Sequence, residues 1–267
     1  MPRVRKFYRR SMRRTVRRTV NQTGKALRRL RKRLHNAPPT SWDFHSDHYL
    51  RHNARRLEHL ASLGIPVRGL SVLEVGAGVG DHSHYYIDRG CPMTITEART
   101  ENLRQLHERY PSQQVAHLDM EQPSQIAGGP FDVIHCYGLL YHLKTPEGAL
   151  EFLAENCNGL LLLETCVSFG DEESINFVSE NARHPTQSFS GTGCRPTRPW
   201  LFSRLREQFE YVYIPKTQPN DSWFPTDWTA PEEHKEGLAR AVFIASRHPL
   251  DNEILTTELI DYQMKHE

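Results

Sequence analysis

The chain has 267 residues, 37% apolar and 25% charged, which is enough for one sizeable α/β domain with appendages. No apolar run approaches the ~20 residues that a membrane-spanning helix needs. The five cysteines lie apart without a C-x-x-C pair, which argues against a structural zinc site and a disulfide framework. The net charge of +2 hides an asymmetry: fifteen of the 34 basic residues lie within 1–35, which contains no acid, so 19 basic residues remain against 32 acidic ones.

Residues 1–38 are predicted to be a basic arm, separated from a domain at 39–250 by a proline-containing linker. In the arm, apolar residues recur near helical spacing and arginines occupy the other faces. Such a pattern can form an amphipathic helix on an anionic membrane surface through residues 1–36 or a nucleic-acid-binding arm. A solvated, disordered tail and a mitochondrial transit peptide are the other interpretations.

Strand-like and helix-like patterns alternate along the domain. A helix with an apolar face precedes Gly64 and Pro66, which end it. Strands are predicted at 71–75, 93–96, 115–117, 131–136, 159–165, 211–215 and 241–246, and helices at about 81–89, 101–110, 146–156 and 199–208. Strands separated by helices indicate a mostly parallel sheet covered on both faces, with a last strand inserted antiparallel at its edge. The tail at 251–267 is predicted to be a short helix or an unpacked end.

A glycine-rich turn follows the first strand. Gly76, Gly78 and Gly80 occupy every second position, and Glu74 stands two places before them. Glycine allows a sharp turn and places no Cβ between chain and ligand, and a strand that ends this way before a helix is typical of a nucleoside cradle. The absence of a following Gly-Lys-Ser/Thr disfavours a phosphate-binding loop. A tight turn without any ligand is the alternative.

Taken with Glu97 at the end of the second strand and Asp119 after the third, this turn resembles class I S-adenosylmethionine-dependent methyltransferases over residues 43–247. The stretch 131–165 is similar to the small-molecule and wobble-uridine tRNA branches of that family. The resemblance implies a Rossmann-like, doubly wound, seven-stranded sheet and S-adenosyl-L-methionine as the cofactor.

The resemblance also assigns residues to the cofactor. Glu97 would accept hydrogen bonds from the ribose, Asp119 from the adenine amine, and Glu74 would lie near the methionyl amine. The full predicted set is Glu74, Gly76, Ala77, Gly78, Gly80, Glu97, Asp119, Met120, Cys136 and Tyr137. A solvated loop acid at Glu97, a cap or turn at Asp119 and a purely structural hydrogen bond at Glu74 are the alternatives.

Two residues after the fourth strand are candidates for catalysis. An alcohol or phenol acceptor must lose a proton, and histidine suits that near neutral pH, so His142 is the predicted base, with Tyr141 beside it. A packing role for His142 is the alternative. Metal-dependent members of the family that the chain resembles carry an Asp cluster after the fourth strand; no Asp occurs within 133–146 here, so no metal is predicted. The Asn-Pro-Pro-Tyr motif of the family's nucleic-acid amino methyltransferases is also absent, which counts against methylation of DNA adenine or glutamine.

The acceptor side is predicted to be built by two long segments. Residues 168–198 read as a functional loop over the strand ends, and 216–237 as an extended aromatic loop. His184, Arg195 and Trp223 are the predicted acceptor-binding residues; a surface lid arginine and a tryptophan covering the sheet edge are the alternatives.

These features predict a methyltransferase acting on an oxygen or nitrogen of a small molecule or glycan intermediate. It would be cytoplasmic, with peripheral contact to an anionic membrane as an option. A tRNA methyltransferase that uses the basic arm is the first alternative, and a non-catalytic S-adenosylmethionine-binding module is the second. A nicotinamide-binding sheet is disfavoured by the glycine spacing.

Overall fold

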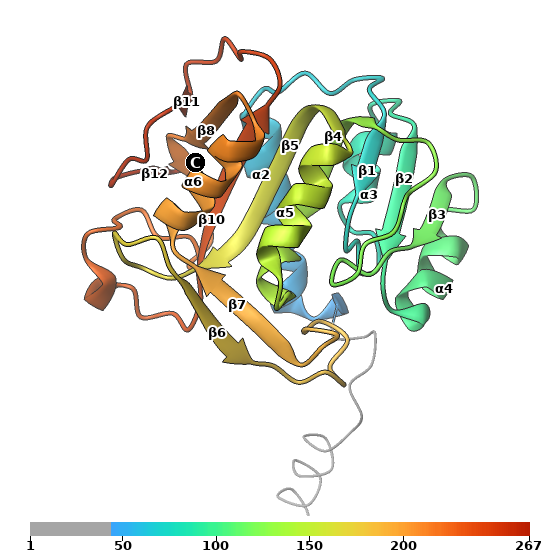
Figure 1. Cartoon of the computed structure of the whole chain (residues 1–267), viewed down its shortest axis with the longest axis horizontal. Helices are drawn as coiled ribbons and strands as arrows, with labels where there is room; N and C mark the ends of the chain where they lie inside the picture. The colour runs from blue at the N-terminus through green and yellow to red at the C-terminus, as the bar shows by residue number, and fades with distance from the viewer. Residues whose placement is uncertain (1–43) are drawn as a thin grey trace, which may run out of the picture. The chain divides into compact units, whose positions relative to one another are not determined.

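The computed structural model describes residues 44–267, so the predicted basic arm lies outside the described residues. An eight-stranded sheet runs through this part of the chain in the order β11-β8-β10-β5-β4-β1-β2-β3 (Figure 1). Its parallel half contains β1 (Val72–Glu74), β2 (Met93–Glu97), β3 (Gln114–His117), β4 (Phe131–Tyr137) and β5 (Cys157–Val167). Its other half contains β8 (Tyr211–Pro215), β10 (Ala239–Ser246) and β11 (Leu255–Thr256), with β10 antiparallel to both β5 and β8. The predicted α/β, Rossmann-like class is confirmed.

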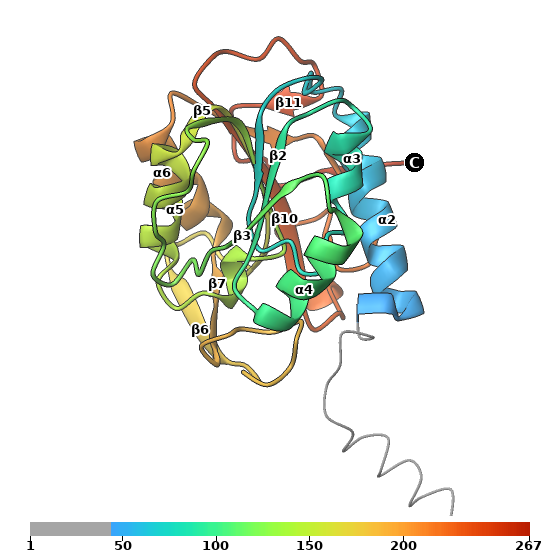
Figure 2. The same ribbon diagram turned by 90° about the vertical axis from the view of Figure 1, so that its right-hand side faces the viewer.

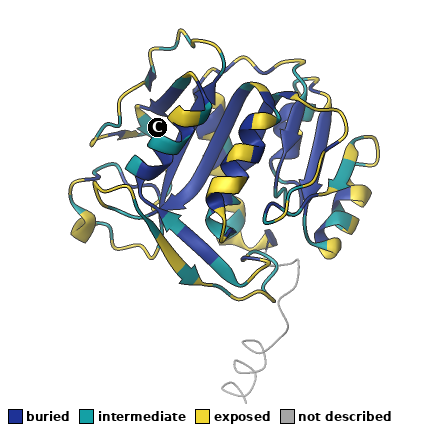
Figure 3. Cartoon of the chain, in the orientation of Figure 1, coloured by how far each residue is buried: buried dark blue, intermediate teal, exposed yellow. Residues whose placement is uncertain are grey.

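Helices cover both faces of the sheet (Figure 2). One face packs against α5 (Pro146–Glu155) and α6 (Arg198–Gln208), and the other against α2 (Asp47–Ser62), α3 (Ser83–Ile87) and α4 (Thr100–Arg109). Side chains alternate between the faces of a strand: Leu161 and Leu163 of β5 join the first core, and Leu160 and Leu162 join the second. Burial on both sides explains why this strand is a continuous apolar run; Figure 3 shows the buried strands and the exposed outer side of α5.

Two predictions about the C-terminal third are corrected. First, β10 does not lie at the sheet edge but between β5 and β8, and all eight of its residues are buried. Second, the tail at 251–267 is neither a helix nor an unpacked end. Its β11 pairs with β8 and thereby adds an eighth strand, and β12 (Met264–Lys265) pairs with β9 (Thr217–Gln218). Backbone hydrogen bonds left open along β8 are satisfied in this way.

The predicted loop at 168–198 contains an antiparallel hairpin. Its strands are β6 (Ile175–Ser179) and β7 (Thr192–Pro196), with Phe177 opposite Cys194. β7 is largely buried while β6 is mostly exposed or half-buried. The hairpin lies beyond the carboxyl end of β5 (Figure 1). Within residues 44–267, no helix is long and apolar enough to cross a membrane.

Candidate functional site

A cavity of about 820 Å³ opens at the carboxyl ends of the parallel strands. Its walls come from the segments that directly follow β1, β2, β3 and β4, from α2 and from the hairpin. This is the edge at which ligands bind in open parallel sheets. The volume falls within the range of small-molecule sites, roughly 300–1,000 Å³.

The glycine-rich turn forms one wall and needs glycine for two reasons. Gly76 and Gly78 have φ of +65° and +58°, a region that disfavours other residues. A Cβ at Gly76 would lie 2.8 Å from the Leu139 side chain, and one at Gly78 would lie 2.9 Å from the Phe44 ring. Both glycines and Ala77 line the cavity.

Gly80 does not line the cavity that residues 44–267 form. Its φ is +80°, and a Cβ there would lie 2.5 Å from the Tyr110 ring of the segment after α4. This glycine lets the turn pack closely against Tyr110, and its assignment to the cofactor stays a prediction.

Glu97 is a buried acceptor that ties two loops together. Its carboxylate accepts hydrogen bonds from the backbone N–H groups of Gly78 (2.8 Å), Ala98 (3.0 Å) and Arg99 (2.9 Å). Burial raises its pKa, and these three N–H groups oppose that rise. Only 7% of Glu97 is exposed, so the alternative of a solvated loop acid is excluded.

Two further predicted acids also border the cavity. Asp119 is half-buried, accepts the Glu121 N–H at 3.0 Å, and lies beside Met120 in the cavity wall. Glu74 accepts the Ser83 hydroxyl at 2.5 Å, and burial raises its pKa to about 7. The cavity thus has oxygen acceptors on three of its lining segments.

Tyr137 and Cys136 are neighbours at the end of β4, and their side chains face opposite sides of the sheet. Tyr137 lines the cavity, and its buried hydroxyl has no hydrogen-bond partner among the described residues. Cys136 faces the opposite side, because neighbouring side chains of a strand alternate. It lies in the core with α5 and α6, and burial raises its pKa to about 12. The Cys136 side chain therefore lies away from the cavity, and its assignment to the cofactor stays a prediction.

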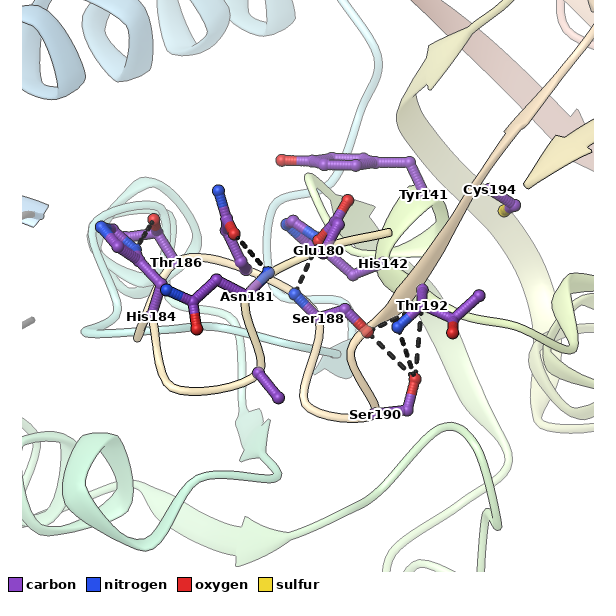
Figure 4. A network of polar contacts seen from close by, with 12 residues as sticks. Tyr141, His142, Glu180, Asn181, His184, Thr186, Ser188, Ser190, Thr192 and Cys194 are labelled. Atoms are coloured by element: carbon purple, nitrogen blue, oxygen red, sulfur yellow. Dashed lines mark hydrogen bonds and ion pairs between the residues drawn. The ribbon is translucent and has the colours of Figure 1, made fainter. Parts of the chain in front are cut away.

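Tyr141 and His142 lie in the short 3₁₀ turn η2 (Leu140–His142), and both border the cavity. Their rings are tilted against each other with centroids 3.9 Å apart. His142 Nδ1 lies 2.5 Å from Glu180 Oε2, at the end of β6 (Figure 4). Burial lowers the pKa of His142, and Glu180 opposes this shift.

Of the three predicted acceptor residues, two line the cavity in the described part of the chain and one does not. Arg195 lines the cavity and donates to the carbonyl oxygens of Tyr141 (3.0 Å) and Cys194 (2.7 Å) and to Glu180 (3.1 Å). Trp223 also lines it, 4.7 Å from the His48 ring. His184 is outside the wall that the described residues form, and its Nδ1 lies 2.9 Å from the Thr186 hydroxyl. The assignment of His184 to the acceptor stays a prediction.

Sequence reasoning missed a buried charge cluster at the cavity wall. Glu164 of β5 is fully buried and lies 2.6 Å from Arg56 of α2 and 2.5 Å from Arg240 of β10. Burial raises the pKa of Glu164, but the two guanidinium groups bring it down to about 2. The cluster of Arg56, Glu164 and Arg240 carries one surplus positive charge, and both arginines border the cavity, which favours a negative group there. The signal in the sequence was the single acid within the apolar run of β5.

No group of three or more His, Cys, Asp or Glu side chains within residues 44–267 is arranged to hold a metal ion.

Comparisons with known proteins agree with this geometry. A family model described as a methyltransferase domain matches residues 8–212. A tRNA U34 carboxymethyltransferase of Actinobacillus succinogenes is 26% identical over 216 residues, covering 72% of this chain and 65% of that protein. The enzyme of the same name from Haemophilus influenzae is 32% identical over 130 residues, covering 45% of this chain and 39% of that protein. The chain thus spans between about two fifths and two thirds of the length of these curated relatives.

Two solved structures share the fold. The N-terminal domain of EvdMO1, crystallised in the presence of SAH and D-fucose, has a TM-score of 0.56 and 21% identity, covering 76% of this chain and 85% of that one. A S-adenosylmethionine-dependent methyltransferase of Mesorhizobium loti has a TM-score of 0.52 and 13% identity, covering 72% and 98%.

Proposed function

The chain belongs to the methyltransferase domain family, and from that premise we propose that it transfers a methyl group from S-adenosylmethionine to an oxygen or nitrogen of a small molecule or glycan intermediate. The observation that carries the proposal is the cavity edge formed by Gly76, Gly78 and Glu97, which offers close backbone approach and a buried carboxylate side by side. The cofactor supplies an electrophilic methyl group when it is bound.

The described residues fit this cofactor. Gly76 and Gly78 line the cavity with backbone in the left-handed region that favours glycine, and Glu97 and Asp119 supply acceptors for hydroxyl and amine donors. The buried Tyr137 hydroxyl without a partner is a group that a ligand would satisfy. Glu74 would lie near the methionyl end, and its pKa near 7 leaves it able to donate or accept.

Residues of this chain would also handle the acceptor. His142 at the cavity wall would take the acceptor's proton, and Tyr141, Arg195 and Trp223 would bound the acceptor region. The cavity volume of about 820 Å³ supports a small acceptor rather than a large flat surface.

A tRNA acceptor is the second candidate. It is favoured by the curated relatives named tRNA U34 carboxymethyltransferase and by the fifteen Lys and Arg within residues 1–35. In that case the cavity would receive a single base while the positive charges of the arm contact phosphates.

The test is calorimetry of the full-length chain with S-adenosylhomocysteine, followed by a methyl-transfer screen with labelled donor. We expect saturable binding that is lost in Gly78→Arg, because the new side chain enters the cofactor region. The matched control is Gly148→Ala, at an exposed helical glycine with open space around it, which should bind as the wild type does. A folded wild-type chain that fails to bind would refute both enzyme proposals, and binding without methyl transfer to any class of acceptor would favour a non-catalytic module.

A further inference from the structure

The hairpin places a carboxylate against the candidate base. Glu180 follows β6, 38 residues beyond His142 in the chain, and its Oε2 lies 2.5 Å from His142 Nδ1. The side chains of His142 and Glu180 are only 13% and 6% exposed. Because the ring also borders the cavity and Glu180 engages Nδ1, Nε2 is the nitrogen that remains for a ligand.

Several contacts hold Glu180 in this position. Its Oε2 also accepts the Ser188 N–H at 2.7 Å, and its Oε1 accepts from Arg195 at 3.1 Å. Burial raises the pKa of Glu180, but the bond with His142 and these two donors bring it down to about 2, so the carboxylate is charged at neutral pH. A flexible surface contact would not have three partners.

The hairpin backbone is shaped around the same pair. A Cβ at Gly193 of β7 would lie 2.5 Å from Glu180 Oε1 and 2.6 Å from the Tyr141 carbonyl oxygen. Any other residue at position 193 would push Glu180 or η2 away. Arg195, two residues on, donates to that same carbonyl oxygen. Hairpin and η2 are therefore fitted to each other at the His142 ring.

We propose that Glu180 is the positioning residue of the catalytic base: it accepts the Nδ1 proton of neutral His142 and thereby leaves Nε2 as the acceptor that faces the ligand. This inference rests on the proposed function. In the step, the acceptor's O–H bond breaks, its electron pair stays on the oxygen, and the proton bonds to Nε2. Glu180 then faces an imidazolium that it stabilises, and the Nε2 proton later leaves to water.

The test measures the protonation of the His142 ring by NMR. Two-bond ¹H–¹⁵N spectra of the full-length chain with ¹⁵N-labelled histidine, assigned with His142→Gln, report which nitrogen carries the proton and how the ring titrates. We expect the Nδ1–H tautomer in the wild type near neutral pH. In Glu180→Gln the pKa of His142 should fall, because the carboxylate charge is lost. In Glu180→Asp the pKa of His142 should lie between the values of Glu180→Gln and the wild type.

The matched control is Glu173→Gln, in the same segment, whose carboxylate is half-exposed and pairs with Arg204 outside the cavity; it should leave the His142 titration unchanged. Once an acceptor is known, kcat of Glu180→Gln should fall about 10- to 100-fold with little change in KM, and the acid limb of the kcat profile should move to lower pH.

An Nε2–H tautomer of His142 in the wild-type chain would overturn the proposal; His142→Gln serves only to assign the signals. So would a His142 pKa that Glu180→Gln leaves unchanged. Both results are independent of S-adenosylhomocysteine binding. Failure of that binding would refute the proposed function and leave the tautomer finding standing.

Discussion

Arg55 and Arg56 are neighbours on α2 with very different surroundings. Each has a guanidinium nitrogen 2.6 Å from a glutamate oxygen, Arg55 from Glu58 and Arg56 from Glu164. The first pair is about half-exposed, whereas Arg56 is 4% and Glu164 0% exposed. Equal distances therefore correspond to unequal energies, because water screens the exposed pair and leaves the buried one unscreened.

We predict that Arg56→Met lowers the free energy of unfolding by about 1.5–3 kcal/mol, because buried Glu164 loses one charged hydrogen bond while Arg240 still balances its charge. Arg55→Met should change it by less than about 1 kcal/mol. Urea unfolding followed by circular dichroism measures both. Similar losses in the two variants would contradict the assignment of Arg56, Glu164 and Arg240 to one buried cluster.

At the scale of elements, apolar runs were predictable and polar ones were not. β4, β5 and β8 match their predicted ranges to within two residues, because both faces of each strand are largely buried and the strands read as apolar runs. The β6–β7 hairpin was read as a loop, because Thr-Gly-Cys-Arg-Pro gives no alternation, and its pairing depends on contacts with η2.

The same distinction holds for the site. The glycine turn and Glu97 could be predicted, because the turn is local and Glu97 follows at a known spacing. Glu180 and Arg240 could not, because their partners His142 and Glu164 lie 38 and 76 residues away in the chain. The side of β4 that Cys136 faces could not be predicted either, because it depends on the exact position of the residue in the strand.

The C-terminal segment is anchored by Gln263. Its Oε1 accepts from Gln218 (2.9 Å) and from the Trp228 indole (2.8 Å), and its Nε2 donates to the Pro215 carbonyl oxygen (2.6 Å). It is 8% exposed, so its partners are shielded from water. One side chain thus joins the tail to the segments after β8.

Gln263→Ala should lower the free energy of unfolding by about 2–3 kcal/mol, since it leaves buried donors on Trp228 and Gln218 unpaired. The neighbouring Met264→Ala is the control, because Met264 is 68% exposed and should have little effect. Thermal unfolding and tryptophan fluorescence report the outcome; equal stability of the two variants would mean that the tail contributes nothing through Gln263.

For the whole molecule, two buried glutamates act on stability in opposite pH ranges. The pKa of Glu164 is about 2 in the folded chain, below its ordinary 4.5, so its contribution is present above pH 4.5 and is lost as pH falls toward 2. The pKa of Glu74 is raised by burial to about 7, so its contribution is full below pH 4.5 and is lost as pH rises through 7.

We therefore expect Glu164→Gln to flatten the fall in unfolding free energy between pH 4.5 and 2, and Glu74→Gln to flatten the fall between pH 4.5 and 7. Each group accounts for a slope of at most about 1.4 kcal/mol per pH unit. Urea titrations at half-unit pH steps measure these slopes; wild-type slopes in both variants would refute the assignment.

The basic arm and the acidic domain can be separated by deletion, and this deletion distinguishes a small-molecule acceptor from a tRNA acceptor. Deletion of residues 1–36 removes all the basic residues counted within 1–35 and leaves a strongly acidic chain. If the acceptor is a small molecule, the full-length chain should bind tRNA weakly or not at all, and the deletion should not change that. Any binding of the full-length chain to liposomes should be lost in the deleted chain. RNA binding that is lost with the arm and falls steeply with salt would instead support the tRNA acceptor.

The place of β10 between β5 and β8 has a consequence for synthesis on the ribosome. β5 and β8 emerge before β10, so a growing chain presents two facing strand edges with unpaired backbone groups until residues 239–246 are available. Over that interval Glu164 can pair only with Arg56. β10 thus supplies both the strand that joins β5 to β8 and the second arginine that pairs with Glu164, so a chain truncated before β10 lacks the two together.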